Sequence, residues 1–118
     1  MPANMVNSDF VIANGKPCQV KYRSLAVQGA GDHIIFPATP GVKFRLLAFN
    51  VVASAAQTTT TFSGVTQIGG PVDMNANAMN RMQFNPTGHG QTAENQDFIW
   101  NLSTAAAMNG FVVYIEVR

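Results

Sequence analysis

Apolar residues recur at every second position over short stretches of this chain, and Gly, Pro and Asn clusters separate these stretches. A period of two is typical of half-buried β-strands, whereas the i, i+3, i+4 spacing of an amphipathic helix is not sustained anywhere. In Gln96–Leu102, for example, we expect Phe98, Trp100 and Leu102 to share one inward face. Strands are predicted at Asp9–Ala13, Gln19–Gln28, His33–Ala38, Lys43–Ala53, Thr58–Ser63, Val65–Ile68, Val72–Met74, Arg81–Phe84, Gln96–Leu102 and Phe111–Val117.

Turn dipeptides divide these strands. Asn14-Gly15, Pro40-Gly41 and Asn109-Gly110 predict turns, and Gly69-Gly70-Pro71 predicts the end of a strand. A change in the parity of the apolar positions predicts a bulge near Ser24. Between Val72–Met74 and Arg81–Phe84 we expect a loop, with a single helical turn at residues 76–80 as the alternative.

The strand Lys43–Ala53 is apolar on both faces. We expect Phe44, Leu46, Ala48 and Val52 on one face and Leu47, Phe49 and Val51 on the other. This strand is therefore either central in its sheet or in contact with a partner on its outer face. The C-terminal strand Phe111–Val117 is also strongly apolar, which predicts a position inside a sheet.

About eight strands at intervals close to those of sandwich folds predict an all-β protein, an antiparallel β-sandwich that is jelly-roll-like. The length of 118 residues suits one hydrophobic core. We expect residues 1–17 to form an N-terminal arm or edge strand and residues 18–118 to form a single β-sandwich domain.

Charged residues make up only 11% of the chain and the formal net charge is +1. A weakly charged surface repels its own copies little, which favours self-association. No basic stripe for nucleic acid, no membrane-spanning apolar run and no signal peptide is found in the sequence. Cys18 is the single cysteine and is interpreted as a packing residue.

No catalytic, cofactor-binding or metal-binding arrangement is found in the sequence, so we expect a protein that is not an enzyme. His33 and His89 lack metal-ligand spacing, and the acidic residues show no pairing for acid–base catalysis. The segment Met74–Phe84 is rich in Met, and it either contacts a neighbouring subunit or plugs the end of the sandwich.

A series of short motifs follows in order between Ala26 and Arg118: Pro40-Gly41, Lys43-Phe44-Arg45-Leu46-Leu47, Phe62-Ser63-Gly64, Gly69-Gly70-Pro71, Asn85-Pro86-Thr87-Gly88, Thr92-Ala93, Leu102-Ser103, and Gly110 with Tyr114-Ile115-Glu116-Val117. In these motifs the chain resembles small virion structural proteins of tailed bacteriophages. The resemblance implies a capsid decoration, or cement, protein that is made in the bacterial cytoplasm and bound to the capsid exterior. Such proteins commonly form trimers and bind the major capsid protein; a tail location stays open.

For that role the contact residues are predicted to be Phe10, Ile12, Arg45, Met79, Arg81, Met82 and Phe84. The alternative function is a receptor- or glycan-binding module of a phage tail or head appendage, with Tyr22, Tyr114 and Trp100 as a stacking platform. The parity of Trp100 favours its burial in the core instead.

Overall fold

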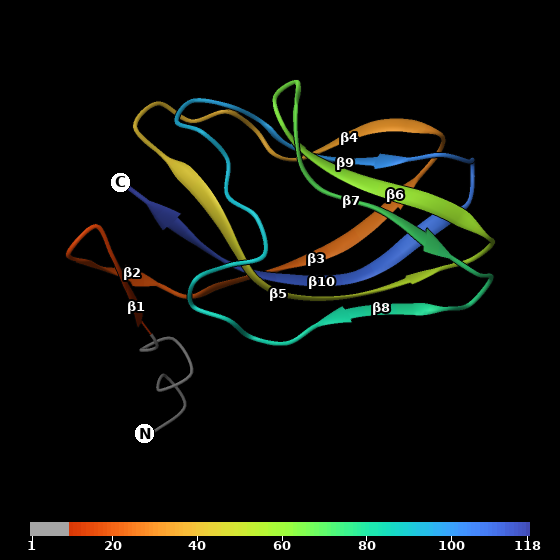
Figure 1. Ribbon diagram of the computed structural model, residues 1–118, viewed down its shortest axis with the longest axis horizontal. Coiled ribbons are helices and arrows are strands. Elements are labelled where there is room, and N and C mark those ends of the chain that lie inside the picture. The colour runs from red at the N-terminus through yellow and green to blue at the C-terminus, as the bar shows by residue number, and fades with distance from the viewer. Residues whose placement is uncertain (1–9) are drawn as a thin grey trace.

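The computed structural model describes residues 10–118, and this part of the chain forms ten β-strands and no helix (Figure 1). The strands are β1 (Phe10–Ala13), β2 (Lys16–Gln19), β3 (Lys21–Gln28), β4 (Gly31–Phe36), β5 (Lys43–Ala53), β6 (Gln57–Ser63), β7 (Thr66–Met74), β8 (Met79–Met82), β9 (Phe98–Leu102) and β10 (Ala107–Val117). The absence of helix in this range also means that it contains no helix able to cross a membrane.

Eight of the strands form two antiparallel sheets that pack face to face. One sheet has the order β3-β10-β5-β8 and the other has the order β4-β9-β6-β7. Strand β3 pairs with β10, β4 with β9, β5 with β8 and β6 with β7. The strands β3 to β6 therefore pair in order with the strands β10 to β7. This nested hairpin, folded over twice, is the jelly-roll arrangement. The predicted jelly-roll-like sandwich is therefore confirmed.

The main core lies between the two sheets. Its largest fully buried side chains include Trp100, Phe98 and Leu46, and the inward face predicted for β9 is confirmed. Phe36 stacks on Phe44 with ring centroids 5.0 Å apart and lies 4.3 Å from the ring of Tyr114. Strand β10 lies between β3 and β5, as its apolar sequence predicts.

A second, smaller core lies on the outer face of the β3-β10-β5-β8 sheet. The strands β1 and β2 pair with each other and form a hairpin that covers part of this face. Val11 and Cys18 of the hairpin are buried with Leu47, Ile115 and Val117 of the sheet. Strand β5 is thus central in its sheet and also covered on its outer face, which explains why both of its faces are apolar.

An irregularity in the β5–β10 pairing changes the predicted faces of β5. The register shifts between Val113 and Tyr114, which pair with Ala48 and Leu46. Leu47 is the extra residue of this bulge, so Ala48 joins it on the outer face. The prediction that Ala48 shares a face with Leu46 was wrong because a single bulged residue reverses the alternation beyond it.

Three other local predictions were wrong. No register shift occurs at Ser24. Val20 and Tyr22 lie on the outer side of the sheet and Leu25 and Val27 face the main core, so regular alternation accounts for the change of parity. The Gly69-Gly70-Pro71 segment lies inside β7, where irregular pairing with β6 accommodates it. Asn109-Gly110 lies inside β10 rather than in a turn. In the two glycine-containing segments, pairing with a distant strand overrides the local turn signal.

Candidate interaction surfaces

The hairpin leaves part of the outer face of the β3-β10-β5-β8 sheet open. In this open part Phe111 of β10 pairs with Ser24 of β3 and Asn50 of β5, so these side chains share the face. The next row toward the end of the sheet contains Val52 and Met79, which pair with each other across β5 and β8. The open rows therefore combine small polar residues with large apolar ones.

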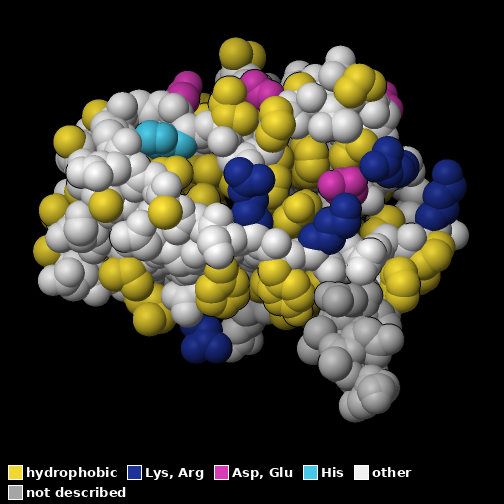
Figure 2. All heavy atoms as spheres, turned by 180° about the vertical axis from the view of Figure 1, so that it is seen from behind, with side chains coloured by type: hydrophobic (Ala, Val, Ile, Leu, Met, Phe, Trp, Pro, Cys, Tyr) yellow, Lys and Arg dark blue, Asp and Glu magenta, His cyan; other side chains and the backbone are white. Residues whose placement is uncertain are grey.

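Several large apolar side chains converge on this open face from different strands. Tyr22 is 62% exposed and Phe111 is 45% exposed, although both belong to strands of a central sheet. Phe10 of the hairpin, Tyr22 and Phe84 border one shallow pocket, together with Val20. Figure 2 shows hydrophobic groups along the lower edge of the molecule, the side on which Figure 1 places the strands of this sheet. We call the set Phe10, Tyr22, Val52, Met79, Phe84 and Phe111 the outer patch.

Four of the predicted contact residues lie on or beside the outer patch. Phe10 and Phe84 come together although they are far apart in the sequence. Met79 and Arg81 point outward from β8, because they pair with the outward residues Val52 and Asn50.

A fifth predicted residue lies on a separate exposed surface. Ile12 is exposed on the solvent side of the hairpin, because its neighbours Val11 and Ala13 are buried against the sheet.

Two predicted contact residues, Arg45 and Met82, make contacts with other parts of the described chain. The Arg45 side chain donates a hydrogen bond from Nε to Gln91 Oε1 (2.6 Å) and another from Nη1 to Pro86 O (3.0 Å). Arg45 therefore fixes the loop that follows β8. Met82 pairs with Phe49 on the inner face of its sheet and borders a cavity between the two sheets, and it is still 40% exposed because β8 is an edge strand.

Tyr22 and Phe111 are members of the outer patch that were not predicted as contact residues. Phe111 has the same parity as Val113 and Ile115, so the sequence places it on the correct face. What the sequence lacks is the point at which the hairpin stops covering that face, because this depends on how β1 and β2 fold back.

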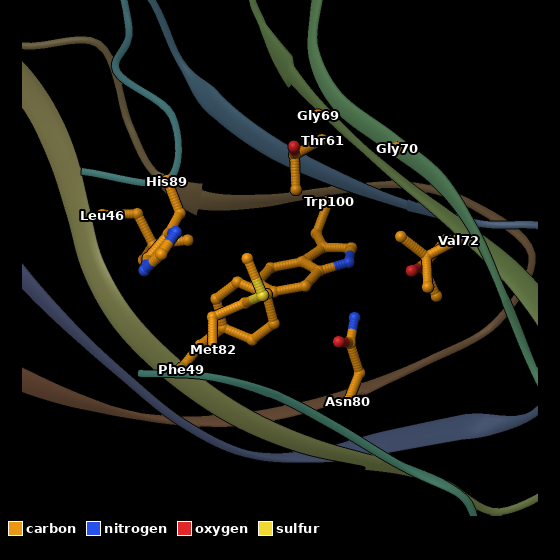
Figure 3. A pocket seen from close by; sticks show the side chains of 11 residues that line it. Leu46, Phe49, Thr61, Gly69, Gly70, Val72, Asn80, Met82, His89 and Trp100 are labelled. Atoms are coloured by element: carbon orange, nitrogen blue, oxygen red, sulfur yellow. The ribbon is translucent and has the colours of Figure 1, made fainter. Parts of the chain in front are cut away.

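A cavity of about 190 Å³ lies between the sheets on the side of the edge strands β7 and β8 (Figure 3). Phe49 and Met82 line it from one sheet, and Thr59, Thr61 and Trp100 line it from the other. The Phe49 and Trp100 rings meet edge to face, with centroids 5.3 Å apart.

Charged and metal-ligating side chains do not cluster at the outer patch or in the cavity. Glu116 pairs with Lys21 (3.2 Å) and Arg118 (3.1 Å) beside the hairpin, away from the outer patch. Within residues 10–118 no three His, Cys, Asp or Glu side chains are placed to hold a metal ion. His33 and His89 each use Nε2 in a hydrogen bond to a backbone carbonyl.

Comparison with protein-family models, with curated proteins and with solved structures finds no match to this chain.

Proposed function

We propose that this chain is a structural assembly protein, a capsid decoration protein of a tailed bacteriophage that associates with its own copies and with the shell. The observation that supports it is the outer patch, where aromatic side chains from β1, β3 and β10 are exposed together. Exposed apolar patches of this kind are typical of protein-interaction surfaces. Aromatic residues are enriched at interface centres because they bury a large area with few rotatable bonds.

The size of the patch indicates how it would act. Four strands spaced about 4.8 Å apart and about six residues along each give an open face of roughly 400 Å². Two such faces together bury about 800 Å², which is below the roughly 1,200–2,000 Å² of a stable independent interface. The hairpin with Ile12 would extend this area. Many copies bound side by side would add further strength through avidity, as a decorated shell requires.

The weak charge of the molecule and its fold agree with this role. With a net charge of +1, neighbouring copies repel one another little. Jelly-roll domains are used in viral capsids and in lectins, so the fold by itself gives an analogy rather than a function.

The outer patch favours a protein partner over a sugar. A glycan site needs polar groups around its aromatic platform, but the pocket beside Tyr22 is bordered by Phe10, Val20 and Phe84. Trp100 is 2% exposed and so does not offer a stacking surface. The second candidate, a glycan-binding module, therefore lacks its predicted stacking platform, since Trp100 is buried and Tyr114 packs against the main core.

The oligomeric state tests the contact surface. We expect the wild-type protein to form a weak trimer that light scattering detects at high protein concentration. The Tyr22→Asp/Phe111→Asp variant should be a folded monomer at the same concentration, because each carboxylate would be desolvated in the contact. A matched control is Val65→Asp, since Val65 is 96% exposed in the β6–β7 turn away from the patch. A wild-type monomer, or a double variant that still forms trimers, would contradict the assignment of the patch.

The capsid role needs a separate test. Wild-type protein and the Val65→Asp variant should bind purified undecorated phage heads and add regular density in electron micrographs, and the double variant should not. If wild-type trimers bind to heads of none of the phages tested, the assignment of the contact surface stands and the decoration role is rejected.

A further inference from the structure

The cavity beneath β7 and β8 is built from apolar and polar walls that face each other. The inner side of β6 carries only polar residues, Gln57, Thr59, Thr61 and Ser63, at positions where a sandwich core is normally apolar. Opposite them lie Phe49 and Met82. This pairing leaves space between the sheets that neither wall fills.

One wall of the cavity holds a buried hydrogen-bond donor without an acceptor. Trp100 is 2% exposed, and its Nε1 has no hydrogen-bond partner in the described part of the chain. Buried indole N–H groups normally have a partner, because leaving one unpaired is costly. In Figure 3 the indole nitrogen is turned toward the Val72 and Asn80 side of the cavity.

Two other polar side chains line the cavity. His89 Nε2 lies 2.6 Å from the carbonyl oxygen of Gln83. Since a carbonyl only accepts, this ring nitrogen carries the proton and donates it. Asn80 also lines the cavity, and in Figure 3 its side-chain nitrogen lies toward the indole nitrogen while its oxygen is turned away.

We propose that this cavity binds a small monocyclic aromatic molecule bearing a hydroxyl group, that is, a ligand of the phenol class. An apolar cavity of about 150 Å³ holds benzene, so about 190 Å³ accommodates one ring with one small substituent. The ring packs against Phe49 and Met82 on one wall, and the hydroxyl oxygen accepts a hydrogen bond from Trp100 Nε1, beside the side-chain amide of Asn80. The inference is independent of the outer patch, which lies on the opposite face of the sheet.

Phenol and toluene form a matched pair of probes, because they have nearly the same shape and only phenol hydrogen-bonds. Titration calorimetry should show wild-type protein binding phenol. Trp100→Phe should weaken phenol binding by about tenfold, the equivalent of one hydrogen bond, and change toluene binding less than about threefold. Trp100 is the single tryptophan, so phenol should also shift the fluorescence of the wild-type protein when excitation is selective for tryptophan.

A blocking variant keeps the test decisive if Trp100→Phe fails to fold. Val72 lies on the edge strand β7, is 38% exposed, and pairs with the cavity residue Thr59 of β6. Val72→Phe therefore places a ring at the cavity mouth with little disturbance of the core. Val72→Phe should abolish phenol binding and the phenol-induced rise in melting temperature, whereas Val65→Phe should keep both. No phenol binding by the wild-type protein, or binding that Val72→Phe leaves intact, would overturn the proposal.

Discussion

Gly110 shows how one residue is fixed by a distant strand. It lies in the middle of β10, and a Cβ there would overlap the carbonyl oxygen of Asn50 and lie 2.8 Å from the Cα of Val51 on β5. Only a residue without a side chain allows the two backbones to approach this closely. The sequence Asn109-Gly110 is also a favoured turn dipeptide, so the local pattern alone cannot separate the two uses of glycine.

We predict that Gly110→Ala lowers the free energy of unfolding by about 3 kcal/mol, because the added methyl group pushes β5 and β10 apart. Urea denaturation measures this change. Gly41→Ala is the control: Gly41 has a φ of +75° and open space around its Cα, so only backbone strain of about 1 kcal/mol is expected. Equal losses in the two variants would show that close packing at Gly110 is not the cause.

The contact residues show which parts of the site the sequence can predict. Phe10 and Phe84 were identified because large apolar residues outside the clear core strands are candidates for contacts, and both are exposed. Arg45 and Met82 were assigned on residue type alone. The sequence does not reveal that Gln91 and the Pro86 carbonyl hold Arg45, or that Met82 faces inward. Both facts depend on how the loop after β8 folds back on β5.

At the scale of elements, the β1–β2 hairpin decides which part of the sheet is core and which part is surface. Val11 and Ala13 are buried against the sheet, and Phe10 and Ile12 are exposed. Alternation in the sequence predicts this division of faces within the strand. It does not predict that the hairpin lies on the outer face of β5 and β10, because the hydrophobic effect is non-directional and does not specify which apolar surface the hairpin covers.

Adjacent substitutions in β1 test this assignment. Val11→Ser should lower the free energy of unfolding by about 2 kcal/mol, because a buried apolar side chain is lost and a hydroxyl is placed in an apolar site. Ile12→Ser should change it by no more than about 0.5 kcal/mol, since Ile12 is exposed. Urea melts of both variants check the prediction, and the reverse order of effects would place the hairpin with its other face on the sheet.

At the scale of the whole molecule, the proposed assembly would rest on apolar rather than charged contacts. The chain has 7 basic and 6 acidic residues, and Glu116 is already paired with Lys21 and Arg118 beside the hairpin. Arg81 is the one charged member of the open rows of the sheet, among the residues that the structure describes. Salt acts strongly on exposed ion pairs and only weakly on the burial of apolar surface.

The proposed trimer should therefore keep its mass when sodium chloride is raised from about 50 mM to about 1 M, where the Debye length falls to about 3 Å. Sodium sulfate, which strengthens apolar burial, should lower the concentration at which the trimer dissociates. Sedimentation velocity over a dilution series measures both effects, and Arg81→Gln should leave them unchanged. Dissociation in high sodium chloride would mean that charged groups carry the contact, and the outer patch would then be a minor part of the interface.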